Sequence, residues 1–108
     1  MYQLVFYVPE SHCEKVKSAL FKVGAGKIGE YDHCAWQVLG AGQFRPLKNS
    51  KAFIGERGKV EKLPEYRVEM ICEKKNIKKV LSALLTSHPY QTPAYHVVEV
   101  KTLADISE

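Results

Sequence analysis

The sequence is poor in arginine and has no long hydrophobic run. Arginine occurs only at Arg45, Arg57 and Arg67, so the formal charge of +4 and the pI near 9.0 come mainly from lysine. A nucleic-acid surface would be favoured by arginines interleaved with exposed aromatic residues, and that pattern is missing. The lysines are more typical of a solvated helix face, as in "EKKNIKK". We therefore expect no nucleic-acid partner.

Membrane insertion and a disulfide framework are also disfavoured. No apolar run reaches the roughly 18 residues needed to cross a bilayer, and Met1 leads straight into "YQLVFYVPE" without the pattern of a cleaved signal segment. The cysteines, Cys13, Cys34 and Cys72, are odd in number and widely spaced, which suits reduced thiols. We expect a cytoplasmic protein that does not contact a membrane.

The composition is that of one small soluble domain. The chain has 108 residues, of which 45% are hydrophobic and 26% charged. We treat residues 1–108 as a single domain, whose modest core oligomerisation could extend.

An internal repeat organises the chain. The segment "YQLVFYVPESHCEKVKSALFKV" from Tyr2 aligns without gaps with "YRVEMICEKKNIKKVLSALLTS" from Tyr66. The apolar runs Leu4–Val8 and Val68–Cys72 predict a buried strand at the start of each copy. The same strand-then-helix unit is therefore expected twice.

Each predicted helix has a start signal and an apolar face. Ser11 and Glu14 have the spacing of a capping box, and Asn76 can cap the second helix. The apolar faces recur at helical spacing, with Cys13, Val16, Leu20 and Val23 in the first helix and Ile77, Val80, Leu81, Leu84 and Leu85 in the second.

Each helix is followed by a returning strand, at residues 34–44 and 94–100. The order β-α-β-β-α-β predicts an α+β, ferredoxin-like fold, in which two helices cover one face of a four-stranded antiparallel sheet. The other face stays open, which favours self-association. The long connection at residues 45–65 predicts a projecting arm, partly an extended hairpin or a functional loop.

Two glycine clusters need a physical interpretation. "GAGKIG" at residues 24–29 fits the dinucleotide-binding spacing, but it follows a helix and precedes a strand, so Gly24 is better explained as a helix-ending residue with positive φ. In "GAGQFRPL", Gly40 and Gly42 beside Arg45 could form an anion-binding nest. A bulge or a close approach by another backbone is the favoured alternative.

The stretch "HPYQTPAYHVVEV" marks a corner between the second helix and the last strand. Pro89 ends the helix at His88, and Pro93 fixes entry into the strand. Tyr90 and Tyr95 are expected to bury their rings and keep their hydroxyls hydrogen-bonded. His88 is left without a structural role, so this corner is a candidate binding site or subunit edge.

Metal binding and catalysis have weaker support. Copper or zinc could be held by Cys13, Cys34 and His88, although these lie far apart in sequence and could require more than one subunit. Cys13 and Cys72 are expected in the core, with His12 and His33 near the surface. Glu56, Glu61 and Glu65 are interpreted as solvated loop charges, so no catalytic residue is assigned.

Three stretches, "VGAGKIGEYDHCAWQVLGAGQFRPL", "FIGERGKVEKLPEYRVEMI" and "HPYQTPAY", together resemble the domain inserted in bacterial Nif-three-like proteins of the YqfO type. The resemblance extends from about Tyr2 to Val100. It implies a CutA/PII-like fold and a homotrimer in which strand edges of neighbouring subunits join. The family usually has Glu after the His-Pro-Tyr stretch, where this chain has Gln91.

The resemblance also implies limits on function. Full-length Nif-three-like proteins carry a dinuclear metal centre in flanking halves, which the 108 residues do not include, so we expect no hydrolase activity. The expectation is a non-enzymatic, homotrimeric binding or regulatory module without a fixed cofactor. The alternatives are a CutA-like protein that binds copper or divalent metal ions and, with less support, an enzyme with a site between subunits. The candidate ligand or interface residues of the module are Gly40, Gly42, Phe44, Arg45, Pro46, His88, Pro89, Tyr90 and Pro93.

Overall fold

A computed structural model describes residues 1–107. Its four strands and two α-helices follow in the order β1 (Tyr2–Pro9), α1 (Cys13–Lys22), β2 (Trp36–Phe44), β3 (Glu61–Cys72), α2 (Ile77–Ser87) and β4 (Tyr95–Glu99). Short 3-10 turns occupy Glu10–His12, Lys74–Asn76 and Leu103–Asp105.

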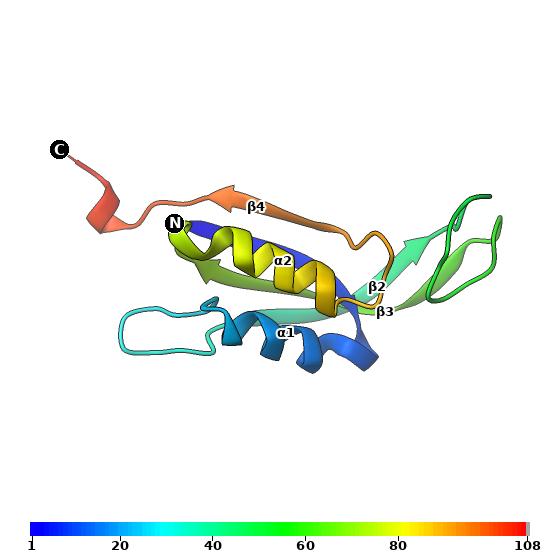
Figure 1. Cartoon of the computed structure of the whole chain (residues 1–108), viewed down its shortest axis with the longest axis horizontal. Coiled ribbons are helices and arrows are strands. Elements are labelled where there is room, and N and C mark those ends of the chain that lie inside the picture. Colours follow the sequence, from blue (N-terminus) through cyan, green and yellow to red (C-terminus); the bar gives the residue numbers. More distant parts are fainter. Residues whose placement is uncertain (108) are drawn as a thin grey trace.

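The strands form one antiparallel sheet in the order β2-β3-β1-β4, and both helices lie on the same side of it (Figure 1). The predicted α+β fold of ferredoxin-like topology is confirmed. Because Tyr2 of β1 pairs with Cys72 of β3, the two copies of the repeat run in opposite directions at the centre of the sheet.

The core lies between the sheet and the helices. Alternate residues of β1 and β3 point toward α1 and α2, as a two-residue strand period requires. The fully buried members include Leu4, Phe6, Val68, Leu20 and Leu84. Cys13 and Cys72 belong to the same cluster, so their prediction as core residues is confirmed.

The helix starts differ from the prediction. Ser11 lies in a 3-10 turn and its hydroxyl is 2.8 Å from Nδ1 of His12, which is itself the residue before α1. The capping box at Ser11 and Glu14 is therefore wrong, because the extra turn moves the helix start to Cys13. Asn76 does precede α2, but its side chain makes no capping hydrogen bond.

The end of α1 is closed by its backbone. Gly24 has a φ of 100°, its N–H donates to the carbonyl of Phe21, and the N–H of Ala25 donates to the carbonyl of Leu20. These two bonds form a Schellman motif, which needs a residue with positive φ after the helix. The helix-ending interpretation of Gly24 is confirmed.

The β2–β3 hairpin extends past the rest of the sheet. The pairing of β1 with β3 stops at Pro9 and Glu65, whereas β3 begins at Glu61. Pro64 is tolerated because it pairs only with β2, outside the part of β3 that lies between two strands. The predicted arm is thus a hairpin closed by a loop, which projects at the right of Figure 1.

The arm makes the molecule elongated. Its principal extents are 53 × 28 × 24 Å and its radius of gyration is 15.4 Å. A compact domain of this length would have a radius of gyration of about 13 Å.

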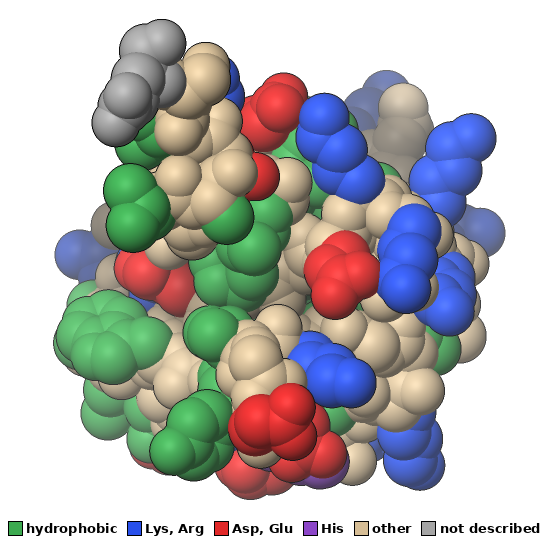
Figure 2. Space-filling view, turned by 90° about the vertical axis from the view of Figure 1, so that its left-hand side faces the viewer, with side chains coloured by type: hydrophobic (Ala, Val, Ile, Leu, Met, Phe, Trp, Pro, Cys, Tyr) green, Lys and Arg blue, Asp and Glu red, His purple; other side chains and the backbone are tan. Residues whose placement is uncertain are grey.

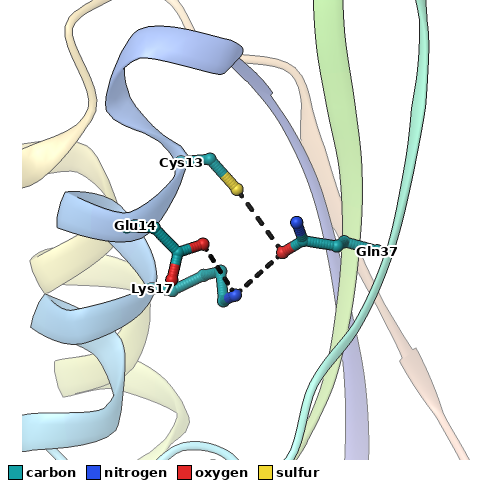
Figure 3. A network of polar contacts seen from close by, with 4 residues as sticks. All are labelled: Cys13, Glu14, Lys17 and Gln37. Carbon is teal, nitrogen blue, oxygen red and sulfur yellow. Dashed lines mark hydrogen bonds and ion pairs between the residues drawn. The ribbon is translucent and has the colours of Figure 1, made fainter.

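A small polar network joins α1 to β2 (Figure 3). The Oε1 atom of Gln37 accepts a hydrogen bond from Lys17 at 2.8 Å and from the Cys13 thiol at 3.6 Å. Lys17 also pairs with Glu14 at 2.9 Å. Burial raises the pKa of the Cys13 thiol, so this cysteine is held as a protonated structural group.

The sheet face away from the helices is only partly polar. A chain of hydrogen bonds crosses its centre, from Gln3 to Glu69 to Arg67 to the Tyr7 hydroxyl. At its edges Trp36, Val38 and Val98 are 59%, 45% and 46% exposed. Figure 2 shows hydrophobic side chains gathered on one side of the molecule and Lys and Arg side chains on the other. Within residues 1–107, no helix is long and apolar enough to cross a membrane.

Candidate functional site

A cavity of about 420 Å³ lies where the β2–β3 hairpin passes beyond the end of β1. Three parts of the chain line it: the end of β1, the hairpin with the loop at its tip, and the corner between α2 and β4. Its lining residues are Tyr7, Gln43, Phe44, Arg45, Pro46, Leu47, Ser50, Ala52, Phe53, Ile54, Glu65, Tyr90, Gln91, Thr92 and Ala94. The volume falls within the roughly 300–1,000 Å³ of small-molecule sites, and most of the lining is apolar or aromatic, as such sites are.

His88 supports the corner from behind and is 6% exposed. Its Nε2 lies 2.7 Å from the carbonyl oxygen of Tyr7, and its Nδ1 lies 3.1 Å from the N–H of Tyr90. A carbonyl can only accept and a backbone N–H can only donate, so Nε2 carries the proton and Nδ1 does not. His88 is therefore a neutral, fully bonded imidazole.

The surroundings of His88 favour the same state. Burial has the largest effect and lowers the pKa of His88. The bond to the Tyr7 carbonyl and the charge of Glu65 raise this pKa by less than burial lowers it, and the nearby His12 lowers it by the smallest amount. His88 thus acquires the structural role that the sequence did not reveal: it ties the corner to β1.

Tyr90 joins the corner to the hairpin. Its hydroxyl donates to Glu65 at 2.8 Å, and its ring lies 5.6 Å from that of Phe44, centroid to centroid. Burial, followed by the bond to Glu65, raises the pKa of Tyr90 well above its usual value. The expectation of a partly buried ring with a bonded hydroxyl is confirmed for Tyr90. It is wrong for Tyr95, which is 38% exposed because β4 is an edge strand.

Glu65 explains the glycine at position 42. A side chain at Gly42 would collide with the side chain of Glu65, whose Cγ would lie 2.7 Å from the added Cβ. Pairing of β2 with β3 runs from Trp36 to Phe44 without a bulge, and neither Gly40 nor Gly42 has positive φ. The predicted bulge is therefore wrong, because both glycines pair regularly within the strand. Gly42 instead leaves space for Glu65.

The loop at the tip of the arm closes over the cavity. The backbone N–H of Lys51 donates to Oε1 of Gln91 at 2.9 Å, and the Arg57 guanidinium donates to the carbonyl of Ser50 at 3.2 Å. Phe53 lies 6.4 Å from Tyr90 and 5.3 Å from His12, ring centroid to ring centroid. Gln91 thus fastens the loop to the corner.

Some of the predicted site residues line the cavity, and others are buried or half-buried without lining it. Phe44, Arg45, Pro46 and Tyr90 line the cavity together. Behind that lining, His88 and Pro93 are buried, and Pro89 is half-buried.

Several lining residues were missed by the sequence reasoning. Glu65 was interpreted as a solvated loop charge, but it faces the cavity and binds Tyr90. A sequence-based prediction that extended the second half's first strand back to Glu65 would have paired Glu65 with Gly40 and so placed it beside the glycines. Ser50 and Phe53 gave no signal, since they lie in a loop whose path depends on tertiary contacts.

The three residues considered for a metal site each form hydrogen bonds within the protein. Cys13 is bonded to Gln37, and both ring nitrogens of His88 have backbone partners. The Cys34 thiol donates to the carbonyl of Asp32 at 3.6 Å. Within residues 1–107 no group of three or more His, Cys, Asp or Glu side chains is placed to hold a metal ion.

A second, smaller hollow of about 250 Å³ lies at the opposite end of β2. It is bounded by Gln3, Ile28, Cys34, Ala35, Trp36, Glu69, Met70 and Ile71. We call it the Trp36 hollow.

No family model matches the chain. The chain is 44% identical over 99 residues to a Bacillus subtilis protein named GTP cyclohydrolase 1 type 2 homolog, a match that covers 92% of this chain and 26% of the relative. It is 36% identical to a solved Bacillus cereus protein related to NIF3, with a TM-score of 0.79, covering 94% of this chain and 26% of that one.

The chain is similar to one segment of these two proteins. The predicted resemblance to the Nif-three-like family is thereby confirmed, and the chain spans about a quarter of the length of these relatives. The PII-like protein CutA of Nostoc matches with a TM-score of 0.68 at 17% identity, over 98% of this chain and 86% of that protein. At that identity the match concerns the fold alone, which is CutA/PII-like as predicted.

Proposed function

We propose that this NIF3-related segment is a non-enzymatic binding module that takes a small organic ligand in the cavity at the base of its arm. The observation that carries the proposal is the meeting of three separate segments, the end of β1, the β2–β3 arm and the α2–β4 corner, around one largely apolar space of about 420 Å³. Convergence of apolar walls with a few polar groups is typical of a small-molecule site.

The contacts around the cavity support binding rather than catalysis. Tyr90 and Glu65 are bonded to each other, and the pKa of Tyr90 is raised, so the phenol stays protonated near neutral pH. Catalytic acids and bases usually have pKa values tuned toward the working pH. The cyclohydrolase in the relatives' name refers to proteins about four times as long, and we assign this chain no part in such a reaction.

Self-association is the second part of the proposal. The open sheet face exposes Trp36, Val38 and Val98 around a polar centre, and β2 and β4 are both edge strands. An exposed apolar surface next to free strand edges favours pairing with further copies. We expect a homotrimer, as the resemblance to CutA/PII-like proteins implies. Light scattering tests this part independently, and a monomer at micromolar concentration would contradict it.

A thermal-shift panel tests ligand binding. Reduced protein is heated with a fragment library, common anions and divalent cations, beside Phe53→Ala. A ligand at about 100 times its dissociation constant adds roughly 2.7 kcal/mol to native stability, which moves the midpoint by several degrees. We expect organic fragments to give such shifts in the wild type and smaller ones in Phe53→Ala.

The control is Tyr31→Ala, which removes an exposed ring outside the cavity. Phe53 is 51% exposed and Tyr31 is 75% exposed, so both variants should fold. Fragment shifts that are equal in Phe53→Ala and Tyr31→Ala would contradict binding in this cavity. The absence of any shift with any fragment would contradict a small-ligand function.

A further inference from the structure

One polar atom beside the cavity has incomplete bonding. The Ser50 hydroxyl oxygen is buried and has no hydrogen-bond partner among the described residues, and Ser50 is one of the residues that line the cavity. Its backbone is fixed on both sides, because its N–H donates to the Leu47 carbonyl at 3.0 Å and its own carbonyl accepts from Arg57. A buried hydroxyl without a partner is costly, so turning the Ser50 side chain toward an acceptor on a bound molecule removes that cost and adds affinity.

The walls of the cavity favour a flat, aromatic occupant. The rings of Phe44 and Phe53 lie 5.6 Å and 6.4 Å from that of Tyr90, at tilts of 59° and 46°. Aromatic rings attract a further aromatic ring in offset or edge-to-face contact. A puckered aliphatic ring of the same size lacks these contacts.

The charges on the lining favour an occupant without net charge. Arg45 and Glu65 contribute one positive and one negative group, and the carboxylate of Glu65 already accepts from Tyr90. The Glu65 carboxylate would repel a simple anion, and the Arg45 guanidinium would repel a simple cation. A neutral ligand avoids both repulsions.

We propose that the cavity takes a neutral, planar, aromatic molecule of one or two rings with a carbonyl or ring-nitrogen acceptor that bonds to the Ser50 hydroxyl. This inference rests on the proposed function, since it names the ligand class of the same cavity. It makes Ser50 the residue that selects among flat molecules and Phe53 the residue that selects flat molecules over puckered ones.

The test compares three probes of nearly equal size by following backbone amide signals of the isotope-labelled full chain during titration. Isoquinolin-1-one is flat and has a lactam carbonyl. Perhydroisoquinolin-1-one keeps the lactam but is puckered, and naphthalene is flat but has no acceptor. We expect isoquinolin-1-one to shift the amides of residues 43–54 and 90–94 and to bind at least about threefold more tightly than either of the others, as one aromatic contact and one hydrogen bond allow.

Two variants separate the contributions. Ser50→Ala should weaken isoquinolin-1-one about three- to tenfold and leave naphthalene unchanged, because it removes only the hydroxyl. Phe53→Leu should weaken both flat probes and reduce their advantage over the puckered lactam. Ser82→Ala, on the exposed side of α2, is the matched control and should change nothing.

The outcomes distinguish this inference from the function beneath it. Equal binding of all three probes at the cavity, or no effect of Ser50→Ala, would overturn the ligand class and leave a small-ligand site in place. If no probe shifts cavity amides and the fragment library also fails, the ligand class and the proposed function fall together.

Discussion

The two helices of the repeat end in different ways, although their sequences align. After α1 the chain turns by backbone geometry alone, with Gly24 at positive φ and two main-chain bonds closing the helix. After α2 it turns by side chains, with the His88 ring bonded to Tyr7 and Tyr90. The corner after α1, here the backbone corner, is closed by main-chain hydrogen bonds alone. The corner after α2, the side-chain corner, uses the His88 ring and directs Tyr90 toward the arm. The candidate ligand site lies at the side-chain corner.

Removing the imidazole should break the side-chain corner. His88→Ala leaves the Tyr7 carbonyl and the Tyr90 N–H without their buried partner and creates a cavity, which should cost about 2–4 kcal/mol. Chemical denaturation measures this loss. His96→Ala on the exposed strand β4 should cost less than about 1 kcal/mol, and equal losses in the two variants would mean that the His88 bonds do not hold the corner.

Breaking the backbone corner should cost less. Gly24→Ala puts a side chain into a left-handed conformation and within 2.8 Å of the Asn76 amide, for an expected loss of about 1–2 kcal/mol. Gly29→Ala is the matched variant, since Gly29 has a φ of 57° and nothing within 4 Å of an added Cβ. The difference between the two free energies of unfolding measures the contact with Asn76 together with the greater backbone strain at the φ of 100° of Gly24. A larger loss in Gly29→Ala would contradict both.

Only the side-chain corner should respond to pH. The pKa of His88 is lowered by burial from 6.5 in the unfolded chain, so below that pH the unfolded chain takes up the proton first. Stability is fully present above pH 6.5 and falls as the pH drops, by at most about 1.4 kcal/mol per pH unit from this residue, until His88 itself is protonated. Unfolding of the wild type and His88→Gln across this range should give a shallower slope for the variant; identical slopes would contradict a neutral, buried His88.

The tether between corner and arm should have the smallest effect on stability. Gln91→Ala removes the acceptor of the Lys51 N–H and should cost about 0.5–1 kcal/mol, because the site is exposed. Faster amide exchange confined to residues 48–54 is the expected sign. Gln91→Glu keeps an acceptor and should behave like the wild type; equal exchange in all three proteins would mean that this bond does not order the loop.

Local sequence patterns were enough to predict most of the fold. The apolar run Leu4–Val8 and the helical period around Val80 predicted the elements. Gly24 was predicted to have a positive φ because few other residues tolerate that conformation. Helix starts were predicted less well, since Ser11 found a closer partner in His12 than the helix backbone.

Only part of the candidate site could be predicted from the sequence, because the rest depends on contacts between distant segments. Phe44, Arg45, Pro46 and Tyr90 stand out in sequence and do line one cavity. Glu65 matters through its bond to Tyr90, 25 residues away, and His88 acquires its role from the Tyr7 carbonyl 81 residues away. No local pattern encodes such contacts.

The most direct test of the ligand site is a measurement of intermolecular nuclear Overhauser effects between bound isoquinolin-1-one and the protein. The account predicts contacts from the probe to the ring protons of Phe44, Phe53 and Tyr90. Contacts confined to Trp36 and Ile28, beside the Trp36 hollow at the other end of β2, would contradict it.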